Sequence, residues 1–327
     1  MRRARVLLIG AGTMGGVHAE SYTRMPDVDL IGIVDTDLER GQRLAQQYQV
    51  TNFVSFIDVP TDSFDLVDVC VPTPFHKEYA LAAAKLTKHV ICEKPIARTI
   101  EDAQEMIQAC KNAGVTLLVG HVVRFFPQYV RAKYLVDEGR IGEVAVARTF
   151  RGGSFPHAWN DWYSNTDWSG GVLVDLTIHD FDFLRWTFGE VDHVYTKLVD
   201  RAKPRLTYSV STLRFKSGVI AHVEGSWAHT GFTTRFEFAG SGGIIDEDMT
   251  KSATLNVSMG ETDRPGVAVP LAPVFENPYY LELRHFIDVI LERSLPRVTA
   301  NDGLAALKIA LACRRSAQLG EPVAVSS

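Results

Sequence analysis

Short apolar runs alternate with helical patterns of apolar and polar positions throughout residues 1–121. The apolar runs are continuous, which is typical of parallel strands that are buried on both faces. Strands are expected at Val6–Ile9, Leu30–Val34, Leu66–Val71, Val90–Cys92 and Val115–Val119. Helices are expected between them, at Met14–Arg24, Leu38–Tyr48, Lys77–Leu86 and Ile100–Asn112. This alternation predicts an α/β domain in which helices cover both faces of a doubly wound parallel sheet.

The pattern changes after Val119. Further helices are expected at Pro127–Glu138, Val172–Phe188, Tyr279–Glu292 and Asn301–Gln318. Further strands are expected at Val144–Phe150, Val194–Val199, Tyr208–Phe215, Val219–Trp227, Thr234–Phe238 and Ala253–Val257. Polar and apolar residues alternate in Thr207–Phe215, which indicates antiparallel strands with one wetter face. Residues 122–327 are therefore expected to form a second, α+β domain around a large, mainly antiparallel open sheet.

Composition narrows the function without identifying it. The 327 residues suit roughly two domains of about 150 residues each. The net charge is −5 and there is no dense basic run, so no nucleic-acid partner is expected. No stretch approaches the ~20 consecutive apolar residues of a transmembrane helix, so no membrane partner is expected. The four cysteines lack metal-ligand spacing, and a reducing cytoplasm is the simplest setting for them.

A glycine-rich segment, GAGTMG, joins the first expected strand to the first expected helix. Gly10 permits a tight turn, Gly12 lets the backbone approach a pyrophosphate, and Gly15 allows close helix–strand packing. Thr13 and Met14 begin the helix, whose N-terminus directs free N–H groups at phosphates. The motif is weak alone, but its position between a strand and a helix predicts a Rossmann dinucleotide-binding domain.

Asp35 ends the second expected strand, about 20 residues after Gly15. A carboxylate there can accept hydrogen bonds from the adenosine ribose, and it would repel a 2′-phosphate. NAD is therefore expected as the cofactor in preference to NADP. Arg40, the next basic residue, is expected on the following helix with its side chain in solvent. The alternative is an ordinary loop in which Asp35 begins the next turn.

The segment VPTPFH follows the strand at Leu66–Val71. Loops at the carboxyl ends of parallel strands border the ligand crevice. Pro72 and Thr73 are therefore candidate cofactor contacts. His76 is a further candidate, with the alternative that it starts the next helix and has no chemical role.

Glu93, Lys94 and Pro95 follow the next strand, at the same edge of the sheet. Glu93 and Lys94 are candidate cofactor contacts. Lys94 could also hydrogen-bond the reacting oxygen of a substrate and stabilise the alkoxide-like charge that develops as hydride leaves. The alternative is a solvated lysine that pairs with Glu93. Pro95 is a candidate for a cis peptide that fixes this turn.

A second set of reactive side chains lies in the segment from Gly170 to Asp180. Asp175 and His179 are four residues apart, on one face of the expected helix, so both can reach one substrate. An imidazole with a pKa near neutrality suits removal of a hydroxyl proton. The carboxylate could orient the substrate or raise the basicity of the imidazole. Asp180 and Asp182 are expected to be structural, and a buried, hydrogen-bonded His179 is the alternative to a catalytic one.

The stretch from Arg151 to Trp168 combines indole rings with polar side chains. His157, Trp159 and Trp162 are candidate substrate contacts, because sugar C–H faces pack on flat rings while sugar hydroxyls need hydrogen-bond partners. The alternative is that these aromatic rings only anchor a loop. Arg124 is a further candidate substrate contact, or else part of an interdomain ion pair.

Together these motifs resemble those of the glucose–fructose oxidoreductase / inositol dehydrogenase (Gfo/Idh/MocA) family. The resemblance rests on GAGTMGGVH, the IVD that ends in Asp35, VPTPFH, CEKP, VGHVVRFFP and GGVLVDLTIHD, and it covers nearly the whole chain. It implies Lys94, Asp175 and His179 as the catalytic set, with His179 as proton acceptor. It also implies a late helix, at about 301–318, that packs back on the first domain, and an open sheet that commonly forms subunit contacts.

These observations favour an NAD-dependent oxidoreductase that acts on a secondary hydroxyl of a sugar, a sugar derivative or a cyclic polyol such as inositol. A homodimer or homotetramer is expected, and no metal. One alternative is an NAD-dependent glycoside hydrolase that oxidises its substrate transiently. The other is a non-catalytic, dinucleotide-responsive regulatory protein, which would have no need of Lys94, Asp175 and His179 together.

Overall fold

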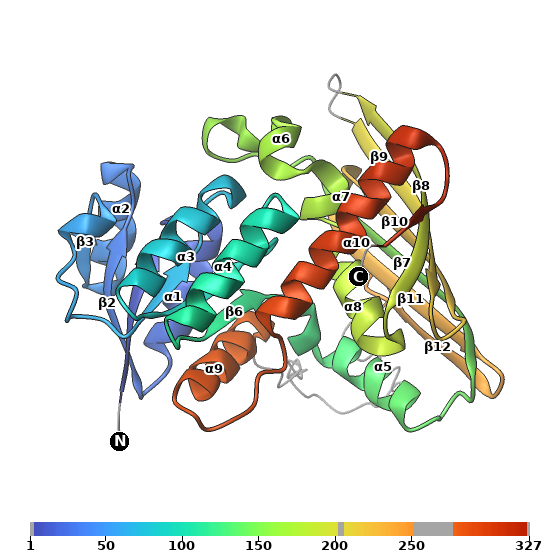
Figure 1. Cartoon of the computed structure of the whole chain (residues 1–327), viewed down its shortest axis with the longest axis horizontal. Coiled ribbons are helices and arrows are strands. Elements are labelled where there is room, and N and C mark those ends of the chain that lie inside the picture. Colours follow the sequence, from blue (N-terminus) through green and yellow to red (C-terminus); the bar gives the residue numbers. More distant parts are fainter. Residues whose placement is uncertain (1–2, 202–205, 252–276, 326–327) are drawn as a thin grey trace, which may run out of the picture.

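The computed structural model describes residues 3–201, 206–251 and 277–325. The strand expected at Ala253–Val257 lies outside these residues. The described chain forms two sheets, with helices on both faces of the first and between the first and the second (Figure 1). None of the described helices is long and apolar enough to cross a membrane.

The first sheet is parallel and has six strands in the order β3-β2-β1-β4-β5-β6. Its strands are β1 (Ala4–Ile9), β2 (Val28–Val34), β3 (Thr51–Phe53), β4 (Leu66–Val69), β5 (His89–Glu93) and β6 (Leu117–Gly120). Its helices are α1 (Thr13–Thr23), α2 (Leu38–Tyr48), α3 (His76–Lys85) and α4 (Ile100–Asn112). Strand order reverses between β1 and β4, and ligands bind at such switch points in open α/β sheets.

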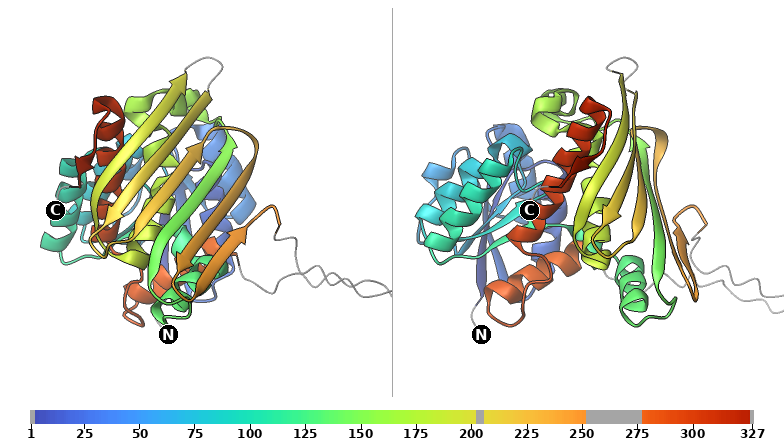
Figure 2. Two further views of the ribbon diagram at one scale, coloured as in Figure 1. Left: turned by 90° about the vertical axis from the view of Figure 1, so that its right-hand side faces the viewer. Right: turned by 45° about the vertical axis from the view of Figure 1, so that its right-hand side comes forward.

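The second sheet has seven strands in the order β12-β11-β7-β10-β9-β8-β13. They are β7 (Val144–Ser154), β8 (Val191–Arg201), β9 (Leu206–Phe215), β10 (Ile220–Ser226), β11 (Ala228–Gly240), β12 (Gly243–Asp248) and β13 (Val323–Ala324). Neighbouring strands are antiparallel except β7 and β10, which are parallel. One face packs on helices, and no described helix covers the other (Figure 2). The two sheets confirm the predicted fold class.

The helix expected at Val172–Phe188 is interrupted, so that prediction was wrong in its detail. The remaining helices are α5 (Pro127–Asp137), α6 (Thr166–Ser169), α7 (Gly171–Asp175), α8 (Ile178–Phe188), α9 (Pro278–Ile290) and α10 (Ala300–Leu319). At the break, the amide of Thr177 donates to the carbonyl of Val172, five residues back, and its hydroxyl donates to the carbonyl of Leu173. Such a wide turn is a local π-type distortion, and these often occur at functional sites.

Helix α10 contacts both sheets. The Thr299 hydroxyl accepts from the amide of Asp302, and the Asp302 carboxylate accepts from the amide of Thr299, which completes a capping box at the start of the helix. Near its start Gly303 packs on the side chain of Val119 in β6, in the first sheet. Near its end the hydroxyl of Ser316 accepts a hydrogen bond from the amide of Thr196 in β8, in the second sheet. The helix therefore fastens the two sheets to each other.

Candidate active site

A cavity of about 740 Å³ lies at the carboxyl ends of the parallel strands. Its other walls come from a 3-10 helix, η4 (Trp159–Ser164), and from α7, α8 and α9. Most predicted site residues line it: Gly10, Gly12, Thr13, Met14, Asp35, Pro72, Thr73, Glu93, Lys94, His157, Trp159, Trp162, Asp175 and His179. Gly15, His76 and Arg124 are not among the described residues that line it.

The glycine loop is shaped to admit a phosphate group. Gly10 has a φ of 101°, in the region that only glycine adopts readily, and a Cβ there would clash with the carbonyl of Cys70. A Cβ on Gly15 would clash with the Gly10 carbonyl, so Gly15 serves helix–loop packing. Gly12 faces open space, with no described atom within 4 Å of a Cβ placed on it. The N-terminus of α1 therefore opens into the cavity, as a pyrophosphate site requires.

Asp35 lies at the end of β2 and is held by four hydrogen bonds. Its carboxylate accepts from the amides of Ala11 (2.7 Å) and Asp37 (2.8 Å). It also accepts from Nε (3.0 Å) and Nη2 (2.6 Å) of Arg40. The prediction that Arg40 points to solvent was therefore wrong. Asp37 caps α2 and fixes Arg40 in its first turn, within reach of Asp35, and this bidentate pair raises the pKa of Arg40.

The loop after β4 contributes Pro72 and Thr73 to the cavity, but His76 is not among the described residues that line it. His76 is buried, and its ring nitrogens lie 3.0 Å from the Pro95 carbonyl oxygen and 2.9 Å from the Val71 carbonyl oxygen. Burial lowers its pKa. His76 therefore fastens the loop after β4 to the loop after β5, where the Lys94–Pro95 peptide is cis. This geometry favours the structural alternative for His76.

Lys94 follows β5, and its side chain contacts Asp175 at the end of α7. Its ammonium donates to Oδ1 of Asp175 (3.0 Å) and to the carbonyl oxygen of Asp175 (2.7 Å). Glu93 instead accepts the backbone amide of Lys94, at 3.0 Å. The contact between the Lys94 ammonium and Asp175 argues against the alternative in which the lysine pairs with Glu93. It also shows that the Asp175 carboxylate pairs with the lysine.

His179 lies in α8 and lines the same cavity as Lys94. Its Nδ1 is buried and has no hydrogen-bond partner among the residues that the structure describes. This argues against a hydrogen-bonded core histidine. Burial, then Lys94, Arg151 and His121, lower the pKa of His179 well below its ordinary value. The imidazole is therefore neutral at neutral pH, which is the form that accepts a proton.

Two tyrosines also line the cavity: Tyr163 lies in the Arg151–Trp168 stretch that the sequence indicated for substrate recognition, whereas no sequence motif singled out Tyr279. Tyr163, beside Trp162 in η4, lines the cavity with its ring centroid 4.0 Å from that of Trp162. Burial, then Asp175 and Glu93, raise the pKa of Tyr163. Tyr279 enters from α9, and burial, then Glu93 and Glu282, raise its pKa to about 12. Both phenols therefore stay protonated at neutral pH and can donate hydrogen bonds.

Arg124 is 2% exposed and binds other protein groups. Its guanidinium donates to both carboxylate oxygens of Asp182, at 2.8 and 2.6 Å, and to the carbonyl of Arg297 at 2.9 Å. The structure therefore favours the ion-pair alternative over a substrate contact. Asp180 similarly pairs with Arg151, with 2.7 Å between Oδ2 and Nε. Both aspartates are structural, as expected.

Comparisons with known proteins agree with this geometry. Residues 4–121 match the model of an oxidoreductase family with an NAD-binding Rossmann fold, and residues 129–246 match the Gfo/Idh/MocA C-terminal domain. An uncharacterised oxidoreductase of Bacillus subtilis, YrbE, is 31% identical over 97% of this chain and 95% of its own. Myo-inositol 2-dehydrogenase of Thermotoga maritima is 32% identical over 95% of this chain and 96% of its own.

A solved structure agrees as well. GenD2 from gentamicin A biosynthesis, in complex with NAD, superposes with a TM-score of 0.88 at 27% identity, covering 100% of this chain and 97% of that one. The open N-terminus of α1 and the carboxylate of Asp35 fit this cofactor. We conclude that the chain belongs to the Gfo/Idh/MocA oxidoreductase family and is an NAD-dependent dehydrogenase of CH–OH groups.

Proposed function

We propose that this enzyme transfers a hydride between NAD and a secondary hydroxyl of a sugar, a sugar derivative or a cyclic polyol of the inositol type. One observation carries the proposal. Lys94, Asp175 and His179 line one cavity, and the glycine loop and Asp35 line the same cavity. The name of the relative from Thermotoga maritima, myo-inositol 2-dehydrogenase, supports the substrate class.

The three side chains have complementary roles in this proposal. An ammonium group has three N–H donors, and Lys94 gives two of them to Asp175. The third is available to the substrate oxygen, where it stabilises the negative charge that develops during oxidation. Asp175 fixes the position of this ammonium. His179 lines the cavity and is neutral, so its imidazole accepts the hydroxyl proton. NAD, when bound, supplies the hydride acceptor.

The aromatic wall supports a carbohydrate or polyol substrate. Trp159 and Trp162 line the cavity with His157 and Tyr163. Indole rings offer apolar faces to C–H groups, while the imidazole and the phenol offer hydrogen bonds to hydroxyls. A substrate with alternating C–H and O–H groups matches both kinds of surface.

The test is NADH formation, followed by absorbance, across a panel of inositols, sugars and sugar derivatives. We expect steady NADH formation with at least one of these compounds. Lys94→Ala and His179→Ala should each lower the turnover number by roughly 100-fold or more, with NAD affinity retained. Glu78→Gln, on the exposed side of α3, is a control that should change neither quantity.

Other outcomes of the same panel would contradict the proposal. Release of a sugar from a glycoside without net NADH would indicate the glycoside hydrolase alternative. NAD binding without turnover of any compound would favour the regulatory alternative. Unchanged rates in both the Lys94 and His179 variants would remove the assigned roles.

We also propose that the enzyme self-associates through the open face of the second sheet (Figure 2). Strand pairing places Ile244, Ala239, Val146 and Ile220 in one row across four strands. Ile244 is 63% and Ile220 is 43% exposed. A contiguous apolar row on an uncovered sheet is typical of a protein–protein contact.

A further inference from the structure

A chain of buried ionisable side chains lies beside the cavity, and the proposed chemistry does not use it. Asp68 in β4 is 0% exposed, His18 in α1 is 1% exposed and Glu93 at the end of β5 is 8% exposed. Charged groups are rarely buried to this degree unless they are paired. Three such groups in contact beside the cofactor cavity therefore require an explanation.

The geometry of His18 indicates that it carries a charge. Its Nδ1 lies 2.8 Å from Oδ2 of Asp68, and its Nε2 lies 3.2 Å from Oε1 of Glu93. The Nδ1 contact is a hydrogen bond, whereas the Nε2 contact is an ion-pair distance without hydrogen-bond alignment. Ionised carboxylates only accept, so a proton on both ring nitrogens makes both contacts favourable. Tyr22 adds a further donor, since its hydroxyl lies 2.8 Å from Oδ2 of Asp68. His18 is therefore an imidazolium between two carboxylates.

Burial and neighbouring charges shift the pKa values of His18 and Glu93 in opposite directions, and the effect of the charges is the larger. Burial alone would lower the pKa of His18, but Cys70 and Asp68 beside it raise that pKa well above its ordinary value. Burial alone would raise the pKa of Glu93, but His18 and Lys94 lower it. Glu93 is therefore an anion at neutral pH.

Only one of these three groups reaches the cofactor cavity. Glu93 lines it, at the end of β5 and next to Lys94. Asp35, which marks the adenosine end, lies on β2, on the other side of the switch point between β1 and β4. A dinucleotide that crosses the switch point therefore brings its nicotinamide end toward Glu93. That ring is cationic when it is oxidised and neutral when it is reduced.

We propose that His18 and Asp68 hold the Glu93 carboxylate in place at the nicotinamide end of the cavity, so that the enzyme favours oxidised NAD over NADH. His18 and Asp68 are positioning residues that act through Glu93. The inference concerns cofactor binding alone, so it does not depend on which substrate the enzyme uses.

Neighbouring groups support an ionic chain rather than a metal site. His18, Asp68 and Cys70 bring three ligand atoms within 4.8 Å of one another. However, the Nδ1–Oδ2 separation of 2.8 Å is a hydrogen-bond distance, and the second nitrogen of His18 already faces Glu93. Glu282 is also buried, with neither carboxylate oxygen hydrogen-bonded to any described residue. Burial and the nearby Glu93 raise its pKa well above the ordinary value, so Glu282 adds no negative charge.

The test compares the dissociation constants of NAD and NADH, measured without substrate by calorimetry and by NADH fluorescence. Glu93→Gln removes the charge and keeps the shape of the side chain. We expect it to weaken NAD binding about tenfold, which corresponds to about 1.4 kcal/mol, and to leave NADH binding nearly unchanged. His18→Gln should change the ratio of the two constants in the same direction. Glu78→Gln on the exposed side of α3 is the matched control and should leave the ratio unchanged.

A double variant separates positioning from a general structural role. If His18 acts through Glu93, then His18→Gln in the Glu93→Gln background should not change the ratio further. A variant that only damages the fold would weaken both forms of the cofactor together, so NADH affinity is an internal control. The proposal is overturned by equal losses for NAD and NADH, by additive effects in the double variant, or by an unchanged ratio. Bound zinc whose removal changes the ratio would also overturn it.

Discussion

At the residue scale, cofactor selection depends on a pair of side chains. Asp35 offers the carboxylate that suits a ribose, yet Arg40 binds that carboxylate with two hydrogen bonds. Arg43 also lines the same end of the cavity. Arg40 and Arg43 therefore place positive charge close to where a 2′-phosphate would lie. Asp35 pairs with one of these two arginines, Arg40.

Replacing Asp35 should release Arg40 for a new partner. We expect Asp35→Ser to raise the ratio of kcat/KM for NADP over NAD by about 10- to 100-fold, because a hydrogen bond to a charged group contributes about 1.5–3 kcal/mol. Steady-state kinetics with both cofactors measures this ratio. In the double variant with Arg40→Ala the gain should disappear. An unchanged ratio in Asp35→Ser would show that Arg40 does not reach the phosphate.

In the proposed mechanism, the lowered pKa of His179 sets the pH dependence of oxidation. Below its pKa the imidazole is protonated and cannot accept the hydroxyl proton, so activity falls as the pH drops. Burial and the cation of Lys94 move this pKa well below 6.5. We therefore expect kcat/KM for alcohol oxidation to decline only at pH values below 6.5. A decline in kcat/KM centred above pH 7 would mean a base whose pKa lies above the ordinary histidine value of about 6.5. Such a result would contradict the assignment of His179 as the base.

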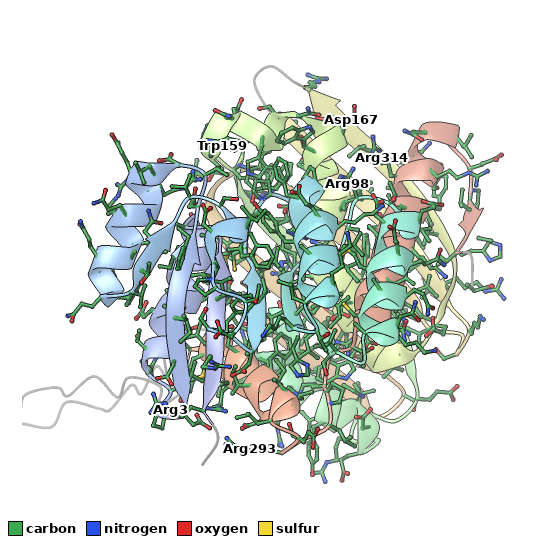
Figure 3. All side chains as sticks on the ribbon, turned by 60° about the vertical axis from the view of Figure 1, so that its left-hand side comes forward. Arg3, Arg98, Trp159, Asp167, Arg293 and Arg314 are labelled. Carbon is green, nitrogen blue, oxygen red and sulfur yellow. The ribbon has the colours of Figure 1, made fainter. Side chains whose placement is uncertain are left out.

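At the element scale, a clamp between two loops positions the helix that carries Asp175. Arg98, which follows the Lys94–Pro95 loop, donates to the carbonyl oxygens of Asp167 (3.0 Å) and Thr166 (3.3 Å) in α6. Figure 3 shows Arg98, Asp167 and Arg314 close together, at the end of the molecule where Trp159 also lies. Gly170, between α6 and α7, packs directly against Arg98 and Val174. The clamp joins the lysine loop to the start of α7.

Two glycines allow this clamp to be tested. Gly170 has a φ of 78° and a ψ of −1°, in the left-handed region, where an alanine should cost roughly 1–2 kcal/mol of stability. Gly189 has a φ of 86° and a ψ of −157°, in a region that is essentially limited to glycine, where an alanine should cost about 1–3 kcal/mol. Only at Gly170 would the added methyl clash, with Val174 and Arg98; at Gly189 no described atom lies within 4 Å. We expect both variants to melt at lower temperature, but only Gly170→Ala to lose turnover in the folded protein. Equal kinetics in the two variants would argue against the clamp.

Several elements could be predicted from the sequence, and others could not, for physical reasons. Carboxyl ends of parallel strands share one edge, so local motifs alone brought Gly10, Asp35, Thr73 and Lys94 to one crevice. Strand β12 was missed because a glycine turn precedes it and half of its six residues are acidic. The break before α8 depends on hydrogen bonds of Thr177 that apolar spacing does not reveal. Tyr279 reaches the cavity from a helix far along the chain, which no local pattern encodes.

At the scale of the whole molecule, two regions distant in sequence complete each other. The edge of the first sheet supplies Lys94, and helices α7 and α8, between β7 and β8 of the second sheet, supply Asp175 and His179. Helix α10 fixes their relative placement by contacts to β6 and β8. No helix of the described residues covers the opposite face of the second sheet, where we propose the subunit contact (Figure 2).

A charge on the open sheet face should disrupt self-association. We expect Ile220→Glu to convert the dimer or tetramer to a smaller species, because a carboxylate in an apolar contact is costly to desolvate. Size-exclusion chromatography with light scattering measures the molar mass. Ile57→Glu is the matched control, since Ile57 is 88% exposed and lies beside the first sheet. A mass that stays oligomeric in Ile220→Glu, or a wild-type monomer, would rule out this face as the interface.

The contact between Lys94 and Asp175 has a consequence for ligand entry. Any hinge motion that widened the crevice to admit a cofactor would draw the ammonium away from its carboxylate. If the proposed role of Lys94 is correct, an opened molecule would lack a positioned ammonium, and oxidation would require closure around the bound ligands. Water that entered the open cleft would then find Lys94 and Asp175 apart.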